Sequence, residues 1–230
     1  MLTEYRAAGD DVLFVVLDLP EKYRETVRAL YFEEVEGGVA RRFPAASRHL
    51  ERSYEVFSRH VDDLFQQHSG ERVTPWEDAL EALLQAIDGQ SLDWYLVGSA
   101  ALAVRGLPVT PGDVDLVLDT GGAYRLGEIL LESLMEPVRP SPGWIGECFG
   151  RAFLHATVEW VGGIDPGVDA LGPNDFGPAA AARLETVCWR GYRLRVPPLD
   201  LLAQVNEARG RLERAAIARS AMTRSGEPPA

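Results

Sequence analysis

The sequence contains little that would indicate a secreted or membrane protein. Its 230 residues include only two cysteines, Cys148 and Cys188, so no disulfide framework can hold the fold together. No apolar run reaches the roughly 18 residues that a membrane-spanning helix needs, and the N-terminus lacks the pattern of a signal peptide. We therefore expect a cytoplasmic protein that does not interact with a membrane.

Positive charge is also scarce. The chain has 23 lysines and arginines against 35 aspartates and glutamates, which gives a net charge of −12. Proteins that bind a phosphate backbone usually carry an excess of lysine and arginine. An extended nucleic acid is therefore not expected as a partner, and a small molecule or a protein is favoured as the substrate.

The first 70 residues are expected to form a small separate α/β unit. Residues 11–20 are typical of a short apolar strand, and residues 20–30 show a helical stripe that begins at a proline. The Gly37-Gly38 pair lies between two short segments and predicts a hairpin. Residues 45–67 repeat apolar side chains at helical spacing, and the polar stretch 68–75 is a candidate linker. No motif in this unit reveals its role.

The second unit, residues 76–222, alternates helix and strand, which predicts an α+β fold with a mixed β-sheet flanked by helices and a C-terminal helical segment. We expect the tail 223–230 to be disordered. The expected elements are helices over 75–88, 99–106, 123–134, 199–210 and 211–222, strands over 94–98, 113–119 and 192–198, one long strand over 151–163, and a loop over 163–180.

Two carboxylates stand at the start of the strand "DVDLVLD". Because residues two apart in a strand share a face, Asp113 and Asp115 project together while Val114 points into the core. Two like charges on one face repel each other unless a cation lies between them, and hard oxygen ligands suit Mg²⁺. The alternative is that Asp113 caps the turn "TPGD" and Asp115 is solvated at the end of the strand.

A Gly-Ser pair precedes these acids, with thirteen residues between Ser99 and Asp113. It joins a buried strand to a helix. Gly98 would let the backbone come close to a phosphate, and Ser99 could cap the helix or bind a phosphate oxygen. Together with the paired carboxylates, this arrangement is typical of a phosphate cradle next to a metal site.

A third acid, Glu159, interrupts the apolar strand "FLHATVEWVGG", where it shares a face with Thr157 and Val161. If this strand neighbours the Asp113–Asp115 strand, the three carboxylates form a cluster suited to two metal ions and to displacement at phosphorus. A Glu159 on a solvated face, or paired with an arginine, is the alternative.

The combination "GSAALAVRGLPVTPGDVDLVL" followed by a strand with one acid resembles the nucleotidyltransferase superfamily related to DNA polymerase beta. It is similar to the minimal bacterial members, which include aminoglycoside and lincosamide nucleotidyltransferases and abortive-infection toxins. The resemblance covers roughly residues 76–220 and excludes residues 1–70.

The resemblance implies transfer of a nucleoside monophosphate from an NTP to an acceptor hydroxyl, with two Mg²⁺ ions. It assigns Gly98 and Ser99 to the phosphates and Asp113, Asp115 and Glu159 to metal binding and catalysis, where Glu159 assists deprotonation of the acceptor.

The chain departs from the family pattern near its C-terminus. The stretch "QVNEARGRLERAAI" has no lysine where the family often carries one, so Arg209, Arg211 or Arg214 could reach the triphosphate instead. A solvated arginine-rich helix face is the alternative.

The remaining histidines and tryptophans are interpreted as structural. His49, His60, His68 and His155 show no metal-ligand spacing with the cysteines. His155, on the face of Glu159, is expected to be hydrogen-bonded within its sheet. Trp144 and Trp160 are expected in the core.

Three hypotheses follow for the function. The first is a Mg²⁺-dependent nucleotidyltransferase acting on a small-molecule or protein hydroxyl. The second is a catalytically degenerate nucleotide-binding or interaction module, and the third is the toxin of a toxin–antitoxin pair. An antitoxin or a second copy of the chain would then be a partner.

Overall fold

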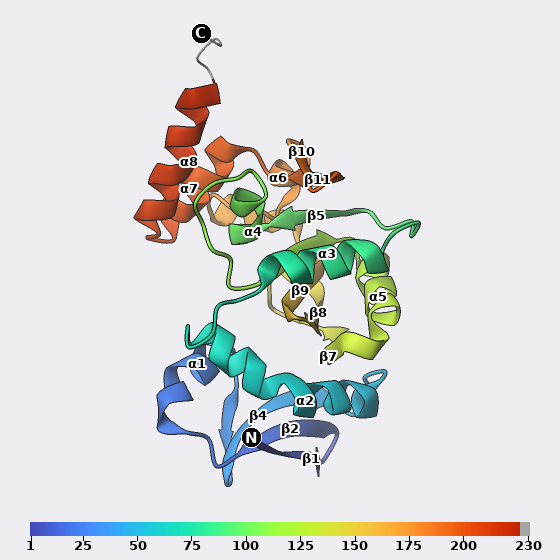
Figure 1. Cartoon of the computed structure of the whole chain (residues 1–230). Coiled ribbons are helices and arrows are strands. Elements are labelled where there is room, and N and C mark those ends of the chain that lie inside the picture. The colour runs from blue at the N-terminus through green and yellow to red at the C-terminus, as the bar shows by residue number, and fades with distance from the viewer. Residues whose placement is uncertain (226–230) are drawn as a thin grey trace.

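The computed structural model describes residues 1–225 and shows an α+β protein built around a four-stranded and a five-stranded β-sheet, with a separate two-stranded hairpin (Figure 1). A unit formed by residues 1–68 lies at one end, a five-stranded sheet lies in the middle, and two C-terminal helices lie at the other end (Figure 1). Within these residues, no helix combines the length and the apolar character that a membrane crossing requires.

The N-terminal unit, residues 1–68, is a four-stranded antiparallel sheet in the order β1-β2-β4-β3, covered by α2. Gly37 adopts a positive φ of 84° in the β3–β4 turn, which agrees with the predicted hairpin. The elements are β1 (Leu2–Ala8), β2 (Asp11–Leu17), a 3₁₀ turn (Glu21–Tyr23), α1 (Arg24–Ala29), β3 (Glu33–Val35), β4 (Gly38–Pro44) and α2 (Leu50–His68).

Aromatic side chains form the core of this unit. Helix α2 buries Phe57 and Phe65 against the sheet, where Phe14 and Phe43 are fully buried and lie 4.6 Å apart between ring centroids. The predicted amphipathic helix is therefore present. Strand β1 was not expected, because none of its residues is fully buried and its sequence lacks an apolar run.

The central sheet has the strand order β5-β6-β9-β8-β7, in which β6 and β9 are parallel and the other neighbours are antiparallel. This is the mixed sheet that the sequence predicts. Its strands are β5 (Trp94–Val97), β6 (Val114–Leu118), β7 (Leu134–Pro140), β8 (Gly146–Leu154) and β9 (Ala156–Ile164).

One face of this sheet forms the main apolar core. Leu96, Leu116 and Trp160 are buried on it beneath α3 (Trp76–Ala86) and α5 (Thr120–Ile129). The Trp160 indole donates a hydrogen bond to the Ala123 carbonyl at 3.0 Å. The core face is therefore closed, and the opposite face is the one available for chemistry.

The segment 151–163 was expected to be one long strand, and this prediction was wrong. Strands β8 and β9 form a hairpin that turns at His155, whose φ is 65°. The apolar alternation continues through the turn, so the pattern does not mark the break. His155 is consequently exposed at the turn and does not lie on the face of Glu159.

Other elements were not recognised from the sequence. Strand β7 contains Pro137 and Pro140, which argue against a strand, but β7 is an edge strand with register shifts and can accommodate them. The expected loop 163–180 contains a 3₁₀ helix (Pro166–Leu171) and α6 (Pro178–Ala181). A two-stranded hairpin follows, formed by β10 (Glu185–Trp189) and β11 (Tyr192–Val196), of which only β11 was expected.

The chain closes with α7 (Leu199–Ala208) and α8 (Leu212–Ser225), which pack on each other near the short helix α4 (Gly98–Ala103). Helix α8 extends beyond the point where the disordered tail was expected to begin. The remaining part of that expected tail, residues 226–230, lies outside the described residues.

The N-terminal unit shares its core with the central sheet. Met135 of β7 and Phe153 of β8 belong to the same apolar cluster as Phe57 and Phe65 of α2. The His60 ring stacks on Phe153 at 4.6 Å between centroids. The two units are therefore joined by packing as well as by the connection over residues 69–75.

A buried ion network crosses this junction. Arg41 of β4 donates two hydrogen bonds to Glu136 of β7, at 3.0 and 2.9 Å, and Arg151 of β8 binds the same carboxylate. The side chains of the three residues are only 8%, 1% and 4% exposed. Charges removed from water in this way require mutual pairing, so Glu136 holds two arginines from different units in place.

We predict that Gly150→Ala destabilises the fold by about 1–3 kcal/mol, which is typical of overpacking in a core. A Cβ at this position would lie 2.4 Å from the Trp160 ring, which is buried and cannot retreat into solvent. Gly121→Ala is the matched control, since position 121 is an exposed residue in the first turn of α5. Urea unfolding measures both, and equal stabilities would contradict the assigned packing.

We predict that Glu136 makes stability fall on acidification. Burial opposes its ionisation, but the charges of Arg151 and Arg41 outweigh burial and lower its pKa from 4.5 to about 2. The pKa is lower in the folded state, so the stabilisation is complete above pH 4.5 and is lost as the pH falls toward 2. This corresponds to about 3 kcal/mol for the shift.

Glu136→Gln should remove that part of the pH dependence and destabilise the protein at pH 7 by about 3–5 kcal/mol, because two buried guanidiniums lose their partner. Chemical unfolding from pH 7 to pH 2 compares the variant with the wild type. Superimposable profiles would show that the network does not hold the junction.

Candidate active site

Four charged side chains form one row on the face of the central sheet opposite α3 and α5. The strand register places Asp115 opposite Glu159, Glu159 opposite Arg151, and Arg151 opposite Glu136. Because paired residues on adjacent strands point to the same face, this row runs over β6, β9, β8 and β7 without interruption. The structure therefore brings the predicted acids of two strands together.

Asp113 and Asp115 flank the buried Val114 at the start of β6. Both aspartates are partly exposed, whereas Val114 is fully buried on the other face. The alternation that the sequence indicates is therefore present. Among the side chains of residues 1–223, none forms an ion pair with either aspartate.

Burial, together with neighbouring negative charge, makes these aspartates harder to ionise. Burial and the charge of Glu159 raise the pKa of Asp113 from 3.8 to about 6. Burial, followed by the charges of Asp113 and Glu159, raises the pKa of Asp115 well above its usual value. A cation held between the two carboxylates would favour their ionised forms and so lower both pKa values.

Gly98 lies directly against the metal-binding candidate Asp115. It starts α4 with a φ of 67°, and a Cβ at this position would stand 2.8 Å from the Asp115 Oδ2 atom. Both the backbone conformation and the close approach exclude a side chain at this position. Ser99, the next residue, is 8% exposed. Gly98 of the predicted turn therefore lies against Asp115, one of the predicted acids.

Glu159 binds Arg151. The Nε and Nη2 atoms of Arg151 both lie 2.8 Å from the Glu159 Oε1 atom. The arginine-paired alternative is therefore the arrangement that the structure shows. In the part of the chain that the structure describes, no group of three or more His, Cys, Asp or Glu side chains could hold a metal ion. The metal-binding role of Glu159 stays a prediction.

A fourth acid, Asp175, also enters the site. It is 2% exposed, accepts a hydrogen bond from the Gly98 N–H at 2.8 Å, and its charge contributes to the raised pKa of Asp115. Sequence reasoning missed it because it lies in the expected loop 163–180. The adjacent Asn174 accepts hydrogen bonds from the N–H groups of Phe176 and Gly177, and this turn fixes Asp175 in place.

Arg209, Arg211 and Arg214 lie near enough to the acids for their charges to act on them. Arg209 contacts Asp175 at 3.4 Å. The charges of Arg211 and Arg214 act to lower the pKa of Asp113, against the stronger effects of burial and Glu159. The short connection between α7 and α8 thus brings positive charge to the site.

The histidines take different structural roles. His68 lies at the end of α2, close enough to Glu159 for the two charges to interact. Burial lowers the pKa of His68, and the negative charge of Glu159 opposes that shift. His49 binds Glu128 at 3.0 Å, and His60 lies 3.5 Å from Asp63.

The remaining candidates for reactivity lie apart from the acids. Both cysteines are free, with Cys148 buried and Cys188 exposed. Trp160 is a core residue as expected, but the prediction for Trp144 was wrong, since its side chain is 47% exposed.

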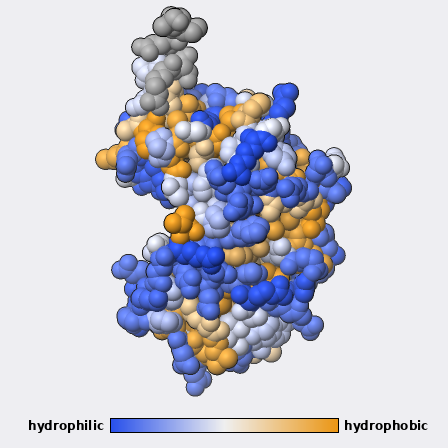
Figure 2. Space-filling model, in the orientation of Figure 1, coloured by the Kyte–Doolittle hydropathy of each residue, from blue (hydrophilic) through white to orange (hydrophobic). Residues whose placement is uncertain are grey.

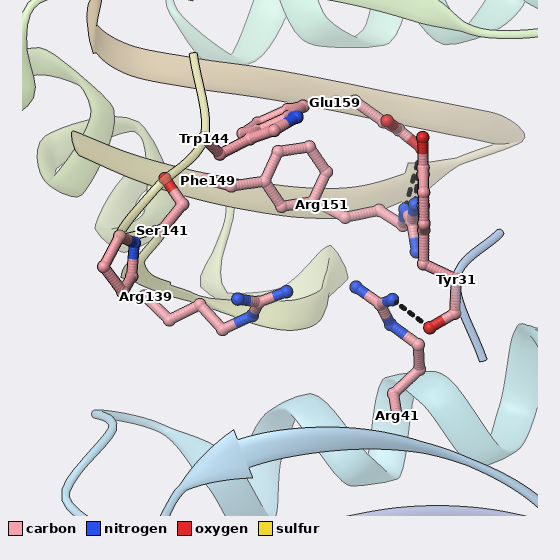
Figure 3. A pocket seen from close by; sticks show the side chains of 9 residues that line it. Tyr31, Arg41, Arg139, Ser141, Trp144, Phe149, Arg151 and Glu159 are labelled. Carbon is pink, nitrogen blue, oxygen red and sulfur yellow. Dashed lines mark hydrogen bonds and ion pairs between the residues drawn. The ribbon is translucent and has the colours of Figure 1, made fainter. Parts of the chain in front are cut away.

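A pocket of about 280 Å³ opens beside Glu159, between the N-terminal unit and the hairpin formed by β7 and β8 (Figure 3). Its lining combines aromatic and basic side chains with that single acid. The lining residues are Tyr31, Arg41, Arg139, Ser141, Pro142, Trp144, Phe149, Arg151 and Glu159.

Comparison with known proteins gave structural likeness only. No protein-family model matches the chain, and no curated protein matches it. The structure is similar to a candidate nucleotidyltransferase from Thermotoga maritima, with 25% identity over 63% of this chain and 91% of that one, at a TM-score of 0.47.

Two further structures show a weaker likeness. The antibiotic-resistance factor ANT(2'')-Ia matches with 14% identity over 63% of this chain and 82% of that one, at a TM-score of 0.41. An antigenic nucleotidyltransferase-like protein from Paracoccidioides brasiliensis matches with 18% identity over 60% of this chain and 71% of that one, at a TM-score of 0.39.

Proposed function

We propose that this chain is a Mg²⁺-dependent nucleotidyltransferase that moves a nucleoside monophosphate from an NTP to an acceptor hydroxyl. The observation that carries the proposal is the arrangement of Asp113, Asp115 and Glu159 beside the Gly98-Ser99 turn. Burial and neighbouring negative charge raise the pKa values of Asp113 and Asp115, so a bound cation would favour their ionised forms.

The donor set fits Mg²⁺. Asp113 and Asp115 supply hard carboxylate oxygens, and Mg²⁺ usually takes one or two carboxylates together with waters and substrate phosphates. A group of three acids is not required for such a site. When bound, the metal would supply positive charge that stabilises the phosphoryl oxygens and the leaving pyrophosphate. We assign Asp113 and Asp115 as the residues that hold it.

Glu159 is proposed to accept the proton of the attacking hydroxyl. Arg151 holds its Oε1 atom, and the Oε2 atom accepts no hydrogen bond from the described residues, which leaves that oxygen for the acceptor. The hydroxyl oxygen forms a bond to the α-phosphorus, and the bond from that phosphorus to the bridging oxygen of the β-phosphate breaks. The hydroxyl proton goes to Glu159 and pyrophosphate leaves.

The triphosphate is proposed to lie near the turn of Gly98 and Ser99, with Arg209, Arg211 and Arg214 in place of the family's lysine. The positions of these arginines support this proposal. Arg209 contacts Asp175, which accepts a hydrogen bond from the Gly98 N–H. The charges of Arg211 and Arg214 act on Asp113. Arginine forks match phosphate oxygens well.

One observation favours the alternative of a catalytically degenerate nucleotide-binding module. The Gly98 N–H is already bound by a carboxylate, that of Asp175, and this places additional negative charge where a phosphate would lie. The two functions differ in turnover, so a pyrophosphate-release assay with a panel of acceptors separates them.

We predict that Asp115→Asn raises the melting temperature of the metal-free protein and abolishes the stabilisation by Mg²⁺ with a non-hydrolysable ATP analogue. Removing one charge relieves the repulsion with Asp113 and Glu159, which is the repulsion that the metal would otherwise relieve. Thermal-shift titration measures both effects. Transfer of label from NTP to acceptor should fall at least about 100-fold, as for loss of an electrostatic stabiliser.

Asp88→Asn is the matched control, because Asp88 is exposed and lies outside the site. It should behave as the wild type in both assays. An Asp115→Asn protein that is stabilised by the metal–nucleotide pair as strongly as the wild type would refute the metal assignment.

A further inference from the structure

The pocket beside Glu159 is built from both units of the chain. Tyr31 and Arg41 come from the N-terminal unit, while Arg139, Phe149 and Arg151 come from β7 and β8. The surface is indented where the N-terminal unit meets the rest of the molecule (Figure 2). The pocket therefore exists only when residues 1–68 are in place, which gives that unit a role at the site.

The pocket lies on the opposite side of Glu159 from the predicted nucleotide site. Across the sheet, Gly98 follows β5 and Asp115 lies on β6, next comes Glu159 on β9, and the pocket then spreads over β8 and β7. Glu159 thus separates the two regions and lines the pocket. A molecule bound here would lie next to the carboxylate that is proposed to take the acceptor's proton.

The pocket carries surplus positive charge in a protein whose net charge is −12. Three guanidiniums, those of Arg41, Arg139 and Arg151, face two carboxylates, those of Glu136 and Glu159, which leaves one positive charge unbalanced. Figure 3 shows the guanidinium groups of Arg41 and Arg139 directed toward each other across the pocket. Like charges in this position favour an anion between them.

Arg139 is the guanidinium without a partner. It forms no ion pair with any of residues 1–225, and its Nε atom is buried with no hydrogen-bond acceptor. Its guanidinium carbon lies 5.7 Å from the centroid of the Phe43 ring. Burial lowers the pKa of Arg139, because the charged guanidinium is less stable there than in water. An unpaired donor of this kind is available to an acceptor on a ligand.

The opposite wall of the pocket is aromatic. Trp144 and Phe149 meet edge to face with their ring centroids 5.5 Å apart, and Figure 3 shows them together on one side of the pocket. Trp144 is 47% exposed and Tyr31 is 79% exposed, although both are large apolar side chains. Tyr31 also has an unusual positive φ of 59°, and the Arg41 side chain holds its carbonyl at 2.8 Å. Exposed rings beside a basic group are typical of a surface for a flat ligand.

We propose that this pocket binds the acceptor, and that the acceptor is a small anionic molecule with a planar ring and a hydroxyl. Its ring packs on Trp144 and Phe149, its anionic group binds Arg139, and its hydroxyl lies at Glu159. This proposal rests on the proposed nucleotidyltransferase function and adds the chemical class of the substrate. The volume of about 280 Å³ suits a small molecule rather than a macromolecular segment.

The test measures binding rather than turnover. The probe is 6-hydroxynaphthalene-2-sulfonate, a fluorescent anionic ring compound with a hydroxyl, and its neutral counterpart is 2-naphthol. Fluorescence anisotropy gives both dissociation constants for the full chain. We expect the wild type to bind the sulfonate at least about tenfold more tightly than the neutral compound, as a charge-assisted hydrogen bond implies.

Arg139→Gln should weaken sulfonate binding at least about tenfold and leave 2-naphthol within about twofold. Arg139→Lys keeps the charge and should recover part of the loss. Arg24→Gln is the charge-matched control, since Arg24 is an exposed arginine paired with Glu21 away from the pocket. Circular dichroism establishes that each variant is folded, and the comparison of the two probes on the wild type needs no variant.

Three results would overturn the proposal: no saturable binding of the sulfonate, equal affinity for both probes, or sulfonate binding that is unchanged by Arg139→Gln. Displacement of the sulfonate by the Mg²⁺–ATP analogue would also overturn it, because it would make the pocket part of the nucleotide site. Nucleotide binding is measured separately by the Asp115→Asn thermal shift. A failed acceptor proposal therefore leaves that result standing, and a failed nucleotide proposal leaves the probe result standing.

Discussion

The buried carboxylate of Glu136 is the contact on which the rest of the structure depends. It holds Arg41 of the N-terminal unit and Arg151 of the central sheet, and Arg151 in turn holds Glu159. A burial this complete is tolerable only because each charge has a partner. The same network therefore joins the two units, fixes the orientation of the proposed general base and forms one wall of the pocket.

Charge divides the open face of the sheet into two regions. Around β6 and β9 several carboxylates lie together, and burial followed by the charges of their neighbours raises the pKa values of Asp113 and Asp115. Around β8 and β7, guanidiniums outnumber carboxylates, and Arg139 is left without a partner. Glu159 stands at the boundary. The acidic region therefore favours a cation, and the basic region favours an anion.

Short motifs predicted the centre of this site, while the contacts around it could not be predicted. The spacing of Gly98 and Asp115 carries local information, because a glycine and a strand of alternating burial follow directly from residue type. The β8–β9 hairpin was missed because apolar alternation runs through His155 without a break. Asp175 and the partners of Glu136 were missed because long-range pairing leaves no local pattern: Arg41 and Glu136 are 95 residues apart in the chain.

The placement of Tyr31 and Arg41 on the accessory unit has a consequence for how such a protein can diversify. The chemistry belongs to the central sheet, but one wall of the pocket is contributed by a separate stretch of chain. Substitutions on that wall can alter which molecule the pocket accepts while β6 and β9, the strands of the proposed nucleotide site, stay intact. Such substitutions are limited, because the N-terminal unit must still place a positive charge at Glu136 and an apolar surface against Phe153. Selectivity can thus vary along one segment, while the two units must still fold together.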